Sequence, residues 1–234
     1  MVRTEDACEI IKYALQNEIK VYLDGGWGVD ALLKRESRIH NDIDLFVELK
    51  HYHDYIYVIK QHGFEEVNTD YTTDGHTVWK DDKQRIIDLH CFEFTDDGIV
   101  YEGDIFPSKT FSGIGKVGDI TVSCIEPLSQ VMLHLGYEHD KNDVHDVMLL
   151  CETFQIAIPD KHADVFAQDG KELSDRKEIL DKTTGNVRNI MYKYSDGSSY
   201  TETFSMKMYT SKDASDRKYS LYVRLEKDKK DYLP

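Results

Sequence analysis

The 234-residue sequence predicts an α+β fold, in which helices flank a mixed β-sheet and a small antiparallel β meander follows. Three observations carry this prediction. Apolar residues recur at helical spacing in some segments and alternate with polar residues in others. The two kinds of segment follow one another in mixed order, without a regular βαβ alternation. Beyond Pro159, segments rich in Tyr, Val and Thr are separated by turn sequences, which is typical of consecutive strands.

The first helix is expected to have Thr4 as its N-cap, because apolar residues follow at helical spacing at positions 7, 10, 11, 14 and 15. Residues 20–24 form a short apolar strand that leads into Gly25-Gly26. A helix over 27–34, a loop over 35–41 and a strand over 42–48 come next, and Gly63 closes the helix that follows. Counting the elements just named, helices after the first are predicted over residues 27–34, 53–63, 127–137 and 143–154. Strands are predicted over residues 20–24, 42–48, 76–81, 85–94 and 118–125. The strands at 76–81 and 85–94 are expected to be antiparallel neighbours.

The organisation changes near Pro159. We therefore expect one domain over residues 1–158 and a C-terminal extension over 159–234 whose role its residues do not indicate. Residues 161–181 are polar, and a short helix is expected among them. Three strands of an antiparallel meander are then predicted at the end of the chain, over residues 186–194, 200–210 and 218–226.

Composition narrows the class of protein. The net charge is −15, and the acidic excess lies before Pro159. Such a module is a poor partner for duplex nucleic acid, which needs clustered Lys and Arg, and it favours divalent metals and cationic small molecules. No apolar run is long enough to span a membrane, and residues 1–20 lack the apolar core of a signal peptide. The four cysteines are scattered without a CxxC pair, so we expect reduced thiols and a cytoplasmic location.

Strand alternation singles out three aspartates. In residues 42–48, Ile43, Leu45 and Val47 share one face and Asp42 and Asp44 the other. In the strand over 85–94, the apolar face is formed by alternate residues in the same way. Asp88 and His90 then lie on the opposite face.

Three carboxylates that converge on neighbouring strands repel one another, so they are not a folding device. Divalent cations between the carboxylates would offset this repulsion, since Mg²⁺ is coordinated by carboxylate oxygens together with substrate phosphates. A pair of metals can hold both the attacking and the leaving oxygen of a phosphoryl transfer. The competing interpretation is that Asp-x-Asp is merely a common spacing on an exposed strand.

The glycine pair favours the catalytic interpretation. Gly25-Gly26, between a strand and a helix, lets backbone approach a ligand closely, and the N-terminus of the helix attracts an anion. That attraction amounts to only about 0.3–1 kcal/mol per charge, which is too weak to hold a triphosphate. A metal ion and a cationic side chain must therefore contribute to binding. Arg38, in the following loop, is the nearest candidate, although it can equally be an ordinary surface arginine.

Together, "GGWGVD", "RIHNDID" and "IIDLH" resemble the nucleotidyltransferases that inactivate antibiotics. The likeness is to lincosamide nucleotidyltransferases and aminoglycoside 2″-nucleotidyltransferases, members of the DNA-polymerase-β-like nucleotidyltransferase superfamily. It covers about Val21 to Phe154 and leaves the C-terminal third unmatched.

The resemblance implies roles for particular residues. Gly25 and Gly26 would line the nucleotide phosphates. The paired aspartates would hold Mg²⁺, and Asp88 would ligate metal or deprotonate the acceptor hydroxyl. Asp30 would orient the loop after its helix. Four further residues are expected at the site: His40 as a phosphate or Asp42 contact, and His90, Tyr137 and Asp143 near the acceptor. Each of these has an ordinary structural reading as well.

The expected function is transfer of AMP from ATP to a hydroxyl of a small cationic antibiotic, with Mg²⁺ as cofactor and pyrophosphate as product. A homodimer is plausible by resemblance. Two alternatives stay open, namely a nucleotidyltransferase that modifies a protein or an RNA end, and a non-catalytic nucleotide-binding module. The acidic module argues against RNA, and the presence of all three carboxylates argues against a binding module.

Overall fold

The computed structural model describes residues 1–134, 141–157, 173–180, 187–212 and 219–227. The chain divides into two compact units, Met1–Gln130 and Val131–Pro234, which are described separately. The domain boundary expected after residue 158 stays a prediction. Among the described helices, none combines the length and the apolar character needed to cross a membrane.

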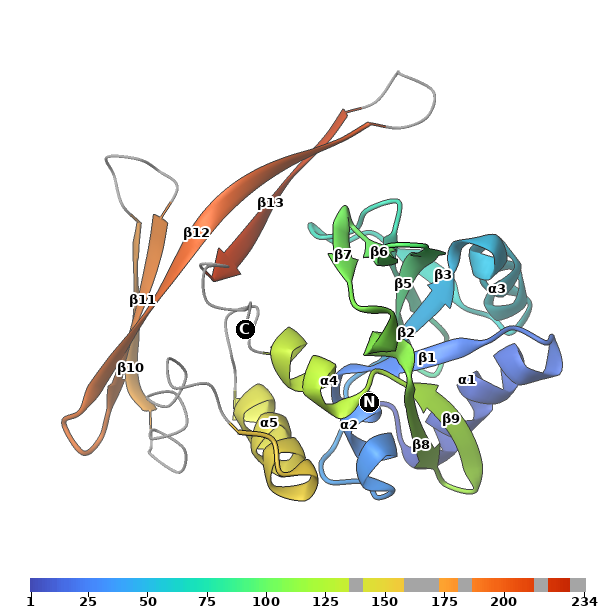
Figure 1. Cartoon of the computed structure of the whole chain (residues 1–234), viewed down its shortest axis with the longest axis horizontal. Coiled ribbons are helices and arrows are strands. Elements are labelled where there is room, and N and C mark those ends of the chain that lie inside the picture. Colours follow the sequence, from blue (N-terminus) through green and yellow to red (C-terminus); the bar gives the residue numbers. More distant parts are fainter. Residues whose placement is uncertain (135–140, 158–172, 181–186, 213–218, 228–234) are drawn as a thin grey trace. The chain divides into compact units, whose positions relative to one another are not determined.

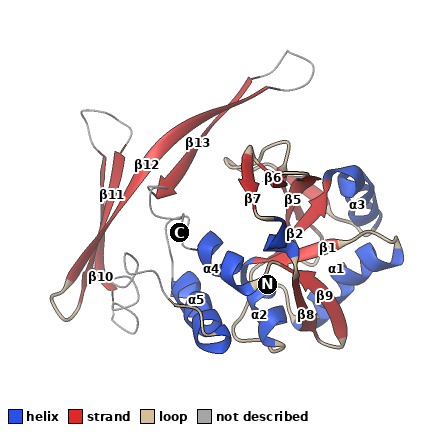
Figure 2. Ribbon diagram, viewed as in Figure 1, coloured by secondary structure: helices blue, strands red, loops and turns tan. Residues whose placement is uncertain are grey.

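The first unit is built on a mixed sheet with helices packed against it (Figure 1, Figure 2). Its elements are, in chain order, α1 (Thr4–Gln16), β1 (Val21–Asp24), α2 (Gly25–Leu33), β2 (Ile43–Glu48), α3 (Leu49–Gln61), β3 (Glu65–Val67), β4 (His76–Lys80), β5 (Ile86–Thr95), β6 (Gly98–Tyr101), β7 (Asp104–Phe106), the 3₁₀ turn η1 (Ser108–Phe111), β8 (Gly113–Val117) and β9 (Ile120–Cys124). Helix α4 (Pro127–His134) begins in this unit. The predicted α+β class is confirmed.

The strand order is β3-β4-β5-β2-β1-β9-β8, with β6 and β7 attached to the far end of β5. Strand β2 pairs in parallel with β5 and antiparallel with β1. Strands β4 and β5 are antiparallel neighbours, as the sequence predicts. The consequence for the site is that β1, β2 and β5 lie side by side in the middle of the sheet.

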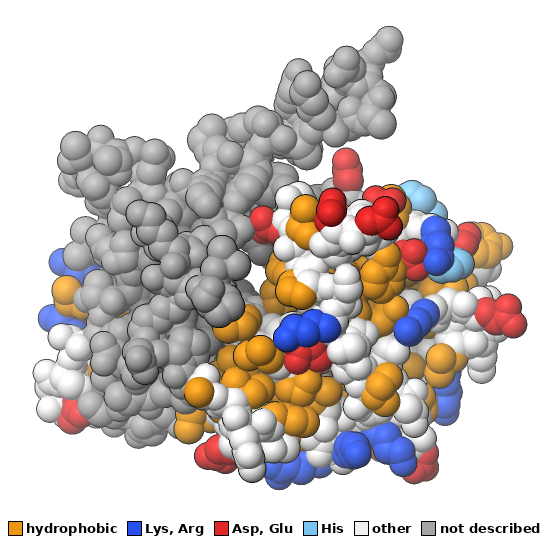
Figure 3. Space-filling model, in the orientation of Figure 1, with side chains coloured by type: hydrophobic (Ala, Val, Ile, Leu, Met, Phe, Trp, Pro, Cys, Tyr) orange, Lys and Arg blue, Asp and Glu red, His pale blue; other side chains and the backbone are white. Residues whose placement is uncertain are grey.

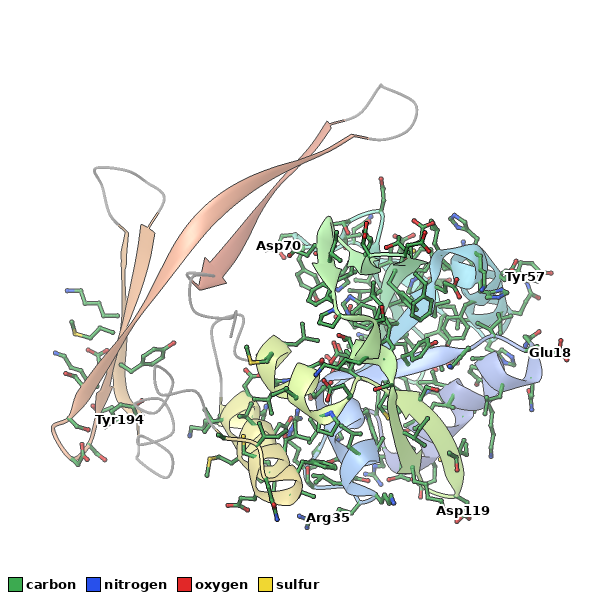
Figure 4. All side chains as sticks on the ribbon, in the orientation of Figure 1. Glu18, Arg35, Tyr57, Asp70, Asp119 and Tyr194 are labelled. Atoms are coloured by element: carbon green, nitrogen blue, oxygen red, sulfur yellow. The ribbon has the colours of Figure 1, made fainter. Side chains whose placement is uncertain are left out.

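One face of these central strands forms the main core. Ile43, Leu45 and Val47 of β2 are fully buried, and so are Ile87 and Leu89 of β5. Helix α3 packs against both strands, and α1 packs against α3. Figure 4 shows side chains filling the space between sheet and helices, with the labelled Glu18, Tyr57 and Asp119 at the rim of the unit. The alternation predicted for β2 and β5 is confirmed, and the opposite face is left to the aspartates.

Several helix starts differ from expectation; α3, for example, begins at Leu49 rather than His53. Arg3, not Thr4, is the N-cap of α1, and its backbone N–H donates to the Asp6 carboxylate at 3.1 Å. Helix α2 begins at Gly25 rather than Trp27, so the glycine pair forms the first helical turn. The short strands β3, β6, β7 and β8 were not predicted, because short segments at sheet edges carry weak periodicity.

The second unit contains α5 (Lys141–Phe154) and a separate antiparallel sheet of β10 (Leu173–Leu180), β11 (Val187–Tyr194), β12 (Ser199–Lys212) and β13 (Tyr219–Lys227). The predicted meander corresponds to β11, β12 and β13. The short helix expected within 161–181 is wrong for residues 173–180, because β10 pairs along its length with β11 and pairing overrides the weak local preference. Residues 158–172 lie outside the described residues.

A buried ion-pair network ties the β4–β5 turn to α1. The guanidinium of Arg85 is 3% exposed and donates to Asp81 at 2.6 Å and to Glu9 at 2.7 Å. Asp81 is itself buried. Removal of the arginine would therefore leave a buried carboxylate without its cation.

We expect Arg85→Ala to lower the free energy of unfolding by about 3–5 kcal/mol, the range for breaking one side of a buried pair. Lys83→Ala is the control, because Lys83 is 60% exposed and lies 4.0 Å from Glu9. Its effect should stay within about 0.5 kcal/mol. Urea unfolding of the three proteins measures both. Equal stabilities for Arg85→Ala and the parent would contradict a stabilising role.

Candidate active site

Two predicted aspartates lie side by side on the central strands. Strands β2 and β5 run parallel with Asp44 directly opposite Asp88. Asp42 lies immediately before β2, on the face that Asp44 shares. The structure thus brings together the three carboxylates that alternation placed on one face.

Asp24 adds a fourth carboxylate that sequence reasoning missed. It ends β1, where it pairs directly with Asp44 across the antiparallel ladder. The only signal in the sequence is its position before Gly25-Gly26. Recognising its role requires knowing that β1 is the neighbour of β2, which local patterns do not reveal.

Crowding perturbs these acids. Burial raises the pKa of Asp44 well above its ordinary value, and the nearby Asp42, Asp88 and Asp24 charges raise that pKa further. Burial and then Asp88 also raise the pKa of Asp42, against the opposing influence of Arg38 and His40. The folded protein therefore holds negative charge here at a cost in free energy.

The first glycine fits tightly against this cluster. Gly25 has φ +54°, a backbone conformation that favours glycine, and a Cβ at this position would collide with the Asp44 carboxylate. Its carbonyl accepts a hydrogen bond from Gln130 Nε2 at 3.1 Å. The start of α2 is thereby fixed against β2.

The second glycine faces basic side chains. A Cβ on Gly26 would collide with the Arg38 guanidinium and would lie 2.5 Å from His40 Nδ1. The other ring nitrogen of His40 bonds Asp30 Oδ2 at 2.5 Å, and both side chains are 2% exposed. Arg38 and His40 thus lie beside the first turn of α2, where the helix N-terminus attracts anions.

Asp30 holds the loop that carries these two residues. Its carboxylate accepts hydrogen bonds from the backbone N–H of Ser37, at 3.0 Å, and from the Ser37 hydroxyl. The buried Trp27 ring packs 4.6 Å from the His40 ring. The expectation that Asp30 orients this loop agrees with these contacts, and Trp27 has a core position.

Two histidines flank Asp88: His76 on the neighbouring strand β4, and His90 two residues further along β5. His76 Nε2 hydrogen bonds Asp88 Oδ1, and His90 Nε2 lies 3.7 Å from the same oxygen. Burial and the neighbouring His76 lower the pKa of His90 to about 3. His90 was predicted near the acceptor, whereas His76 was expected only as a strand residue. Its pairing with β5 is what brings it here.

Two other predicted residues are not placed at this site. Tyr137 lies outside the described residues. Asp143 lies in the first turn of α5, in the second unit. Their assignment to an acceptor pocket stays a prediction.

The visible face of the first unit carries both signs of charge (Figure 3). Acidic side chains gather at its upper edge in that view, and lysines and arginines lie near its centre and along its lower edge.

The fold is that of a nucleotidyltransferase. The sequence profile of the aminoglycoside-2''-adenylyltransferase family matches residues 7–150. The chain belongs to that family.

Individual relatives agree with this assignment. A lincosamide resistance protein of Staphylococcus haemolyticus is 27% identical over 137 residues, which cover 56% of this chain and 83% of the relative. The lincosamide antibiotic adenylyltransferase LnuA, solved with lincomycin, is 25% identical with a TM-score of 0.57, over 64% of this chain and 96% of LnuA. ANT(2'')-Ia, solved with adenylyl-2''-tobramycin, shares the fold at 17% identity and TM-score 0.56, over 70% and 94% of the two chains.

The raised pKa of Asp44 predicts how the metal-free protein responds to pH. A carboxyl group with a raised folded pKa contributes stability below its unfolded pKa, near 3.8, and loses it as pH rises through the folded value. We therefore expect Asp44→Asn in EDTA to have a higher melting temperature than the parent at pH 8. This difference should disappear near pH 4. The gain should be about 2–4 °C per kcal/mol of relieved repulsion.

Asp54→Asn is the matched control, because the Asp54 side chain is 72% exposed on α3. Thermal melts of the three proteins across this pH range make the measurement. A lower melting temperature for Asp44→Asn than for the parent at pH 8 would show that the Asp44 carboxylate stabilises the fold.

Gly25 and Gly63 provide a second matched pair. Both have positive φ, but a Cβ on Gly63 would have nothing within 4 Å. We expect each alanine variant to lose about 1–2 kcal/mol through backbone strain. Only Gly25→Ala should also displace Asp44 and abolish nucleotidyl transfer. Retention of transfer in Gly25→Ala, or its loss in folded Gly63→Ala, would contradict this.

Proposed function

We propose that this enzyme transfers AMP from ATP to a hydroxyl of a lincosamide or an aminoglycoside, with Mg²⁺ as cofactor and release of pyrophosphate. The observation that carries the proposal is the meeting of Asp42, Asp44 and Asp88 beside Gly25 on adjacent strands. The match to LnuA, which is named as a lincosamide adenylyltransferase, supports the reaction type.

The donor set fits Mg²⁺. Asp42 and Asp44 present carboxylate oxygens, which are the ligands this cation prefers, and Asp88 adds a third carboxylate. Burial, and then the neighbouring carboxylates, raise the pKa of Asp44, as expected for groups that need a cation between them. When bound, Mg²⁺ would neutralise charge on the phosphates and orient them.

Other residues of the chain would bind the nucleotide phosphates. The first turn of α2, with Gly26, provides backbone N–H groups for the nucleotide phosphates, and Gly26 leaves room for Arg38, which provides positive charge beside them. His40, held by Asp30, fixes the wall of this phosphate site.

Asp88 is assigned to the acceptor side. One of its oxygens is bonded to His76, and the carboxylate would act as the base that accepts the proton of the acceptor hydroxyl. Positioning and charge neutralisation then supply most of the rate acceleration, as in other phosphoryl transfers.

A cytoplasmic location and a homodimer complete the proposal. The four cysteines are free thiols, which suits a reducing compartment. Sedimentation of the purified chain would measure its oligomeric state.

The test is incubation of the protein with radiolabelled ATP, Mg²⁺ and a panel of lincosamides and aminoglycosides. We expect label on at least one drug, and a rate at least about 10²-fold lower for Asp42→Asn or Asp44→Asn because each substitution removes a charged group at the reacting phosphate. Asp54→Asn should keep the parental rate. Near-normal turnover in either site variant at saturating Mg²⁺ and ATP would overturn the proposal.

The same incubation separates the rival functions. Label on protein or RNA, with none on any drug, would indicate an enzyme that modifies macromolecules. Binding of ATP without turnover on the panel would indicate a nucleotide-binding module.

A further inference from the structure

His76, Asp88 and His90 form a compact cluster of nitrogen and oxygen donors. Strands β4 and β5 place His76 directly opposite His90, and Asp88 lies two residues earlier on the same face of β5. One ligand atom from each residue lies within 4.8 Å of the other two. Backbone register, rather than flexible side-chain reach, sets this arrangement.

Neighbouring side chains fix the orientation of His90. Its Nδ1 is hydrogen bonded to the Tyr101 hydroxyl at 2.9 Å, and its ring stacks on Phe46 at 4.7 Å. These contacts direct Nε2 toward Asp88. A second hydrogen bond that fixes the free nitrogen of an imidazole is the usual support of a metal-binding histidine.

His76 is held by contacts between aromatic rings. Its ring lies 4.2 Å from the His90 ring and 5.3 Å from the Tyr71 ring. The side chains of His76 and Asp88 are each 16% exposed, and that of His90 is 12% exposed. An ion can therefore reach the cluster and keep a water molecule as a further ligand.

The donor chemistry differs from that of the Mg²⁺ site. Mg²⁺ prefers oxygen ligands, whereas two imidazole nitrogens with one carboxylate oxygen suit Zn²⁺, Co²⁺ or Ni²⁺. Tetrahedral Zn–N and Zn–O bonds of about 2.0–2.1 Å require donor atoms a little over 3 Å apart, which small side-chain rotations achieve here.

We propose that His76, Asp88 and His90 bind a single Zn²⁺-class transition-metal ion at a site that shares Asp88, but neither Asp42 nor Asp44, with the proposed Mg²⁺ site. Because Asp88 belongs to both groups, occupancy withdraws it from the acceptor hydroxyl and inhibits transfer. The inhibition rests on the proposed function, whereas the binding does not.

Binding is measured on the tag-free chain without nucleotide, by Zn²⁺ titration calorimetry and by the visible absorption of bound Co²⁺. One equivalent is expected, without the intense thiolate bands that cysteine ligation would give. His76→Ala and His90→Ala should each weaken binding at least tenfold. His51→Ala, on the surface of α3, and Asp42→Asn should bind like the parent.

Tyr101→Phe is the sharpest variant, because it removes only the hydroxyl that orients His90. It should weaken Zn²⁺ about 10–100-fold, the effect typical of losing such a supporting hydrogen bond. If His76→Ala fails to fold, as judged by circular dichroism, His76→Gln replaces it. Zn²⁺ binding that is unchanged in the His76 and His90 variants, or undetectable in the parent, overturns the proposal.

Inhibition is tested separately. Zn²⁺ added to a reaction with saturating Mg²⁺ and ATP should inhibit the parent, and the midpoint should rise at least tenfold in Tyr101→Phe, each protein being compared with its own uninhibited rate. Failure to label any acceptor would reject the proposed function while leaving the Co²⁺ result to judge the metal site. Equal midpoints in the two proteins would reject inhibition through this cluster.

Discussion

Repulsion among carboxylates is the constraint on which this site depends. Asp24, Asp44 and Asp88 occupy matching positions on three adjacent strands, and Asp42 stands just before the middle one. The fold holds them there by burying the other face of the same strands, so the gain from packing Ile43 and Leu45 opposes the electrostatic cost. The chain thus stores unfavourable charge at one point of an otherwise well-packed sheet, a condition expected of a site that receives cations.

The surrounding elements keep these acids close without letting them relax. Gly25 gives Asp44 room that no other residue type would leave, and Gln130 holds the carbonyl of Gly25 in place. In the loop that follows α2, Ser37 and His40 are both hydrogen bonded to Asp30. These bonds keep Arg38, which lies between them in the sequence, beside the start of α2. Anionic and cationic parts of the site are therefore adjacent but attached to different elements.

The face and the approximate bounds of β2 and β5 could be predicted from sequence, because alternation of apolar residues is a local signal. The meeting of Asp42, Asp44 and Asp88 followed from that face together with the family resemblance. Asp24 and His76 could not be found in this way, since their proximity to the site depends on which strands pair, a non-local property. Strand β10 was missed for the same reason, as its polar sequence forms a strand only by pairing with β11.

Backbone register also limits how this protein can change during evolution. An insertion or deletion of one residue within β1, β2 or β5 would turn an aspartate into the core and an isoleucine or leucine toward the substrates. Length variation is therefore compatible with the chemistry only in connections such as residues 68–75, which precede β4 and end next to His76. Divergence in drug preference within this architecture should accordingly proceed through loop length and side-chain exchange, while the central strands keep a fixed number of residues.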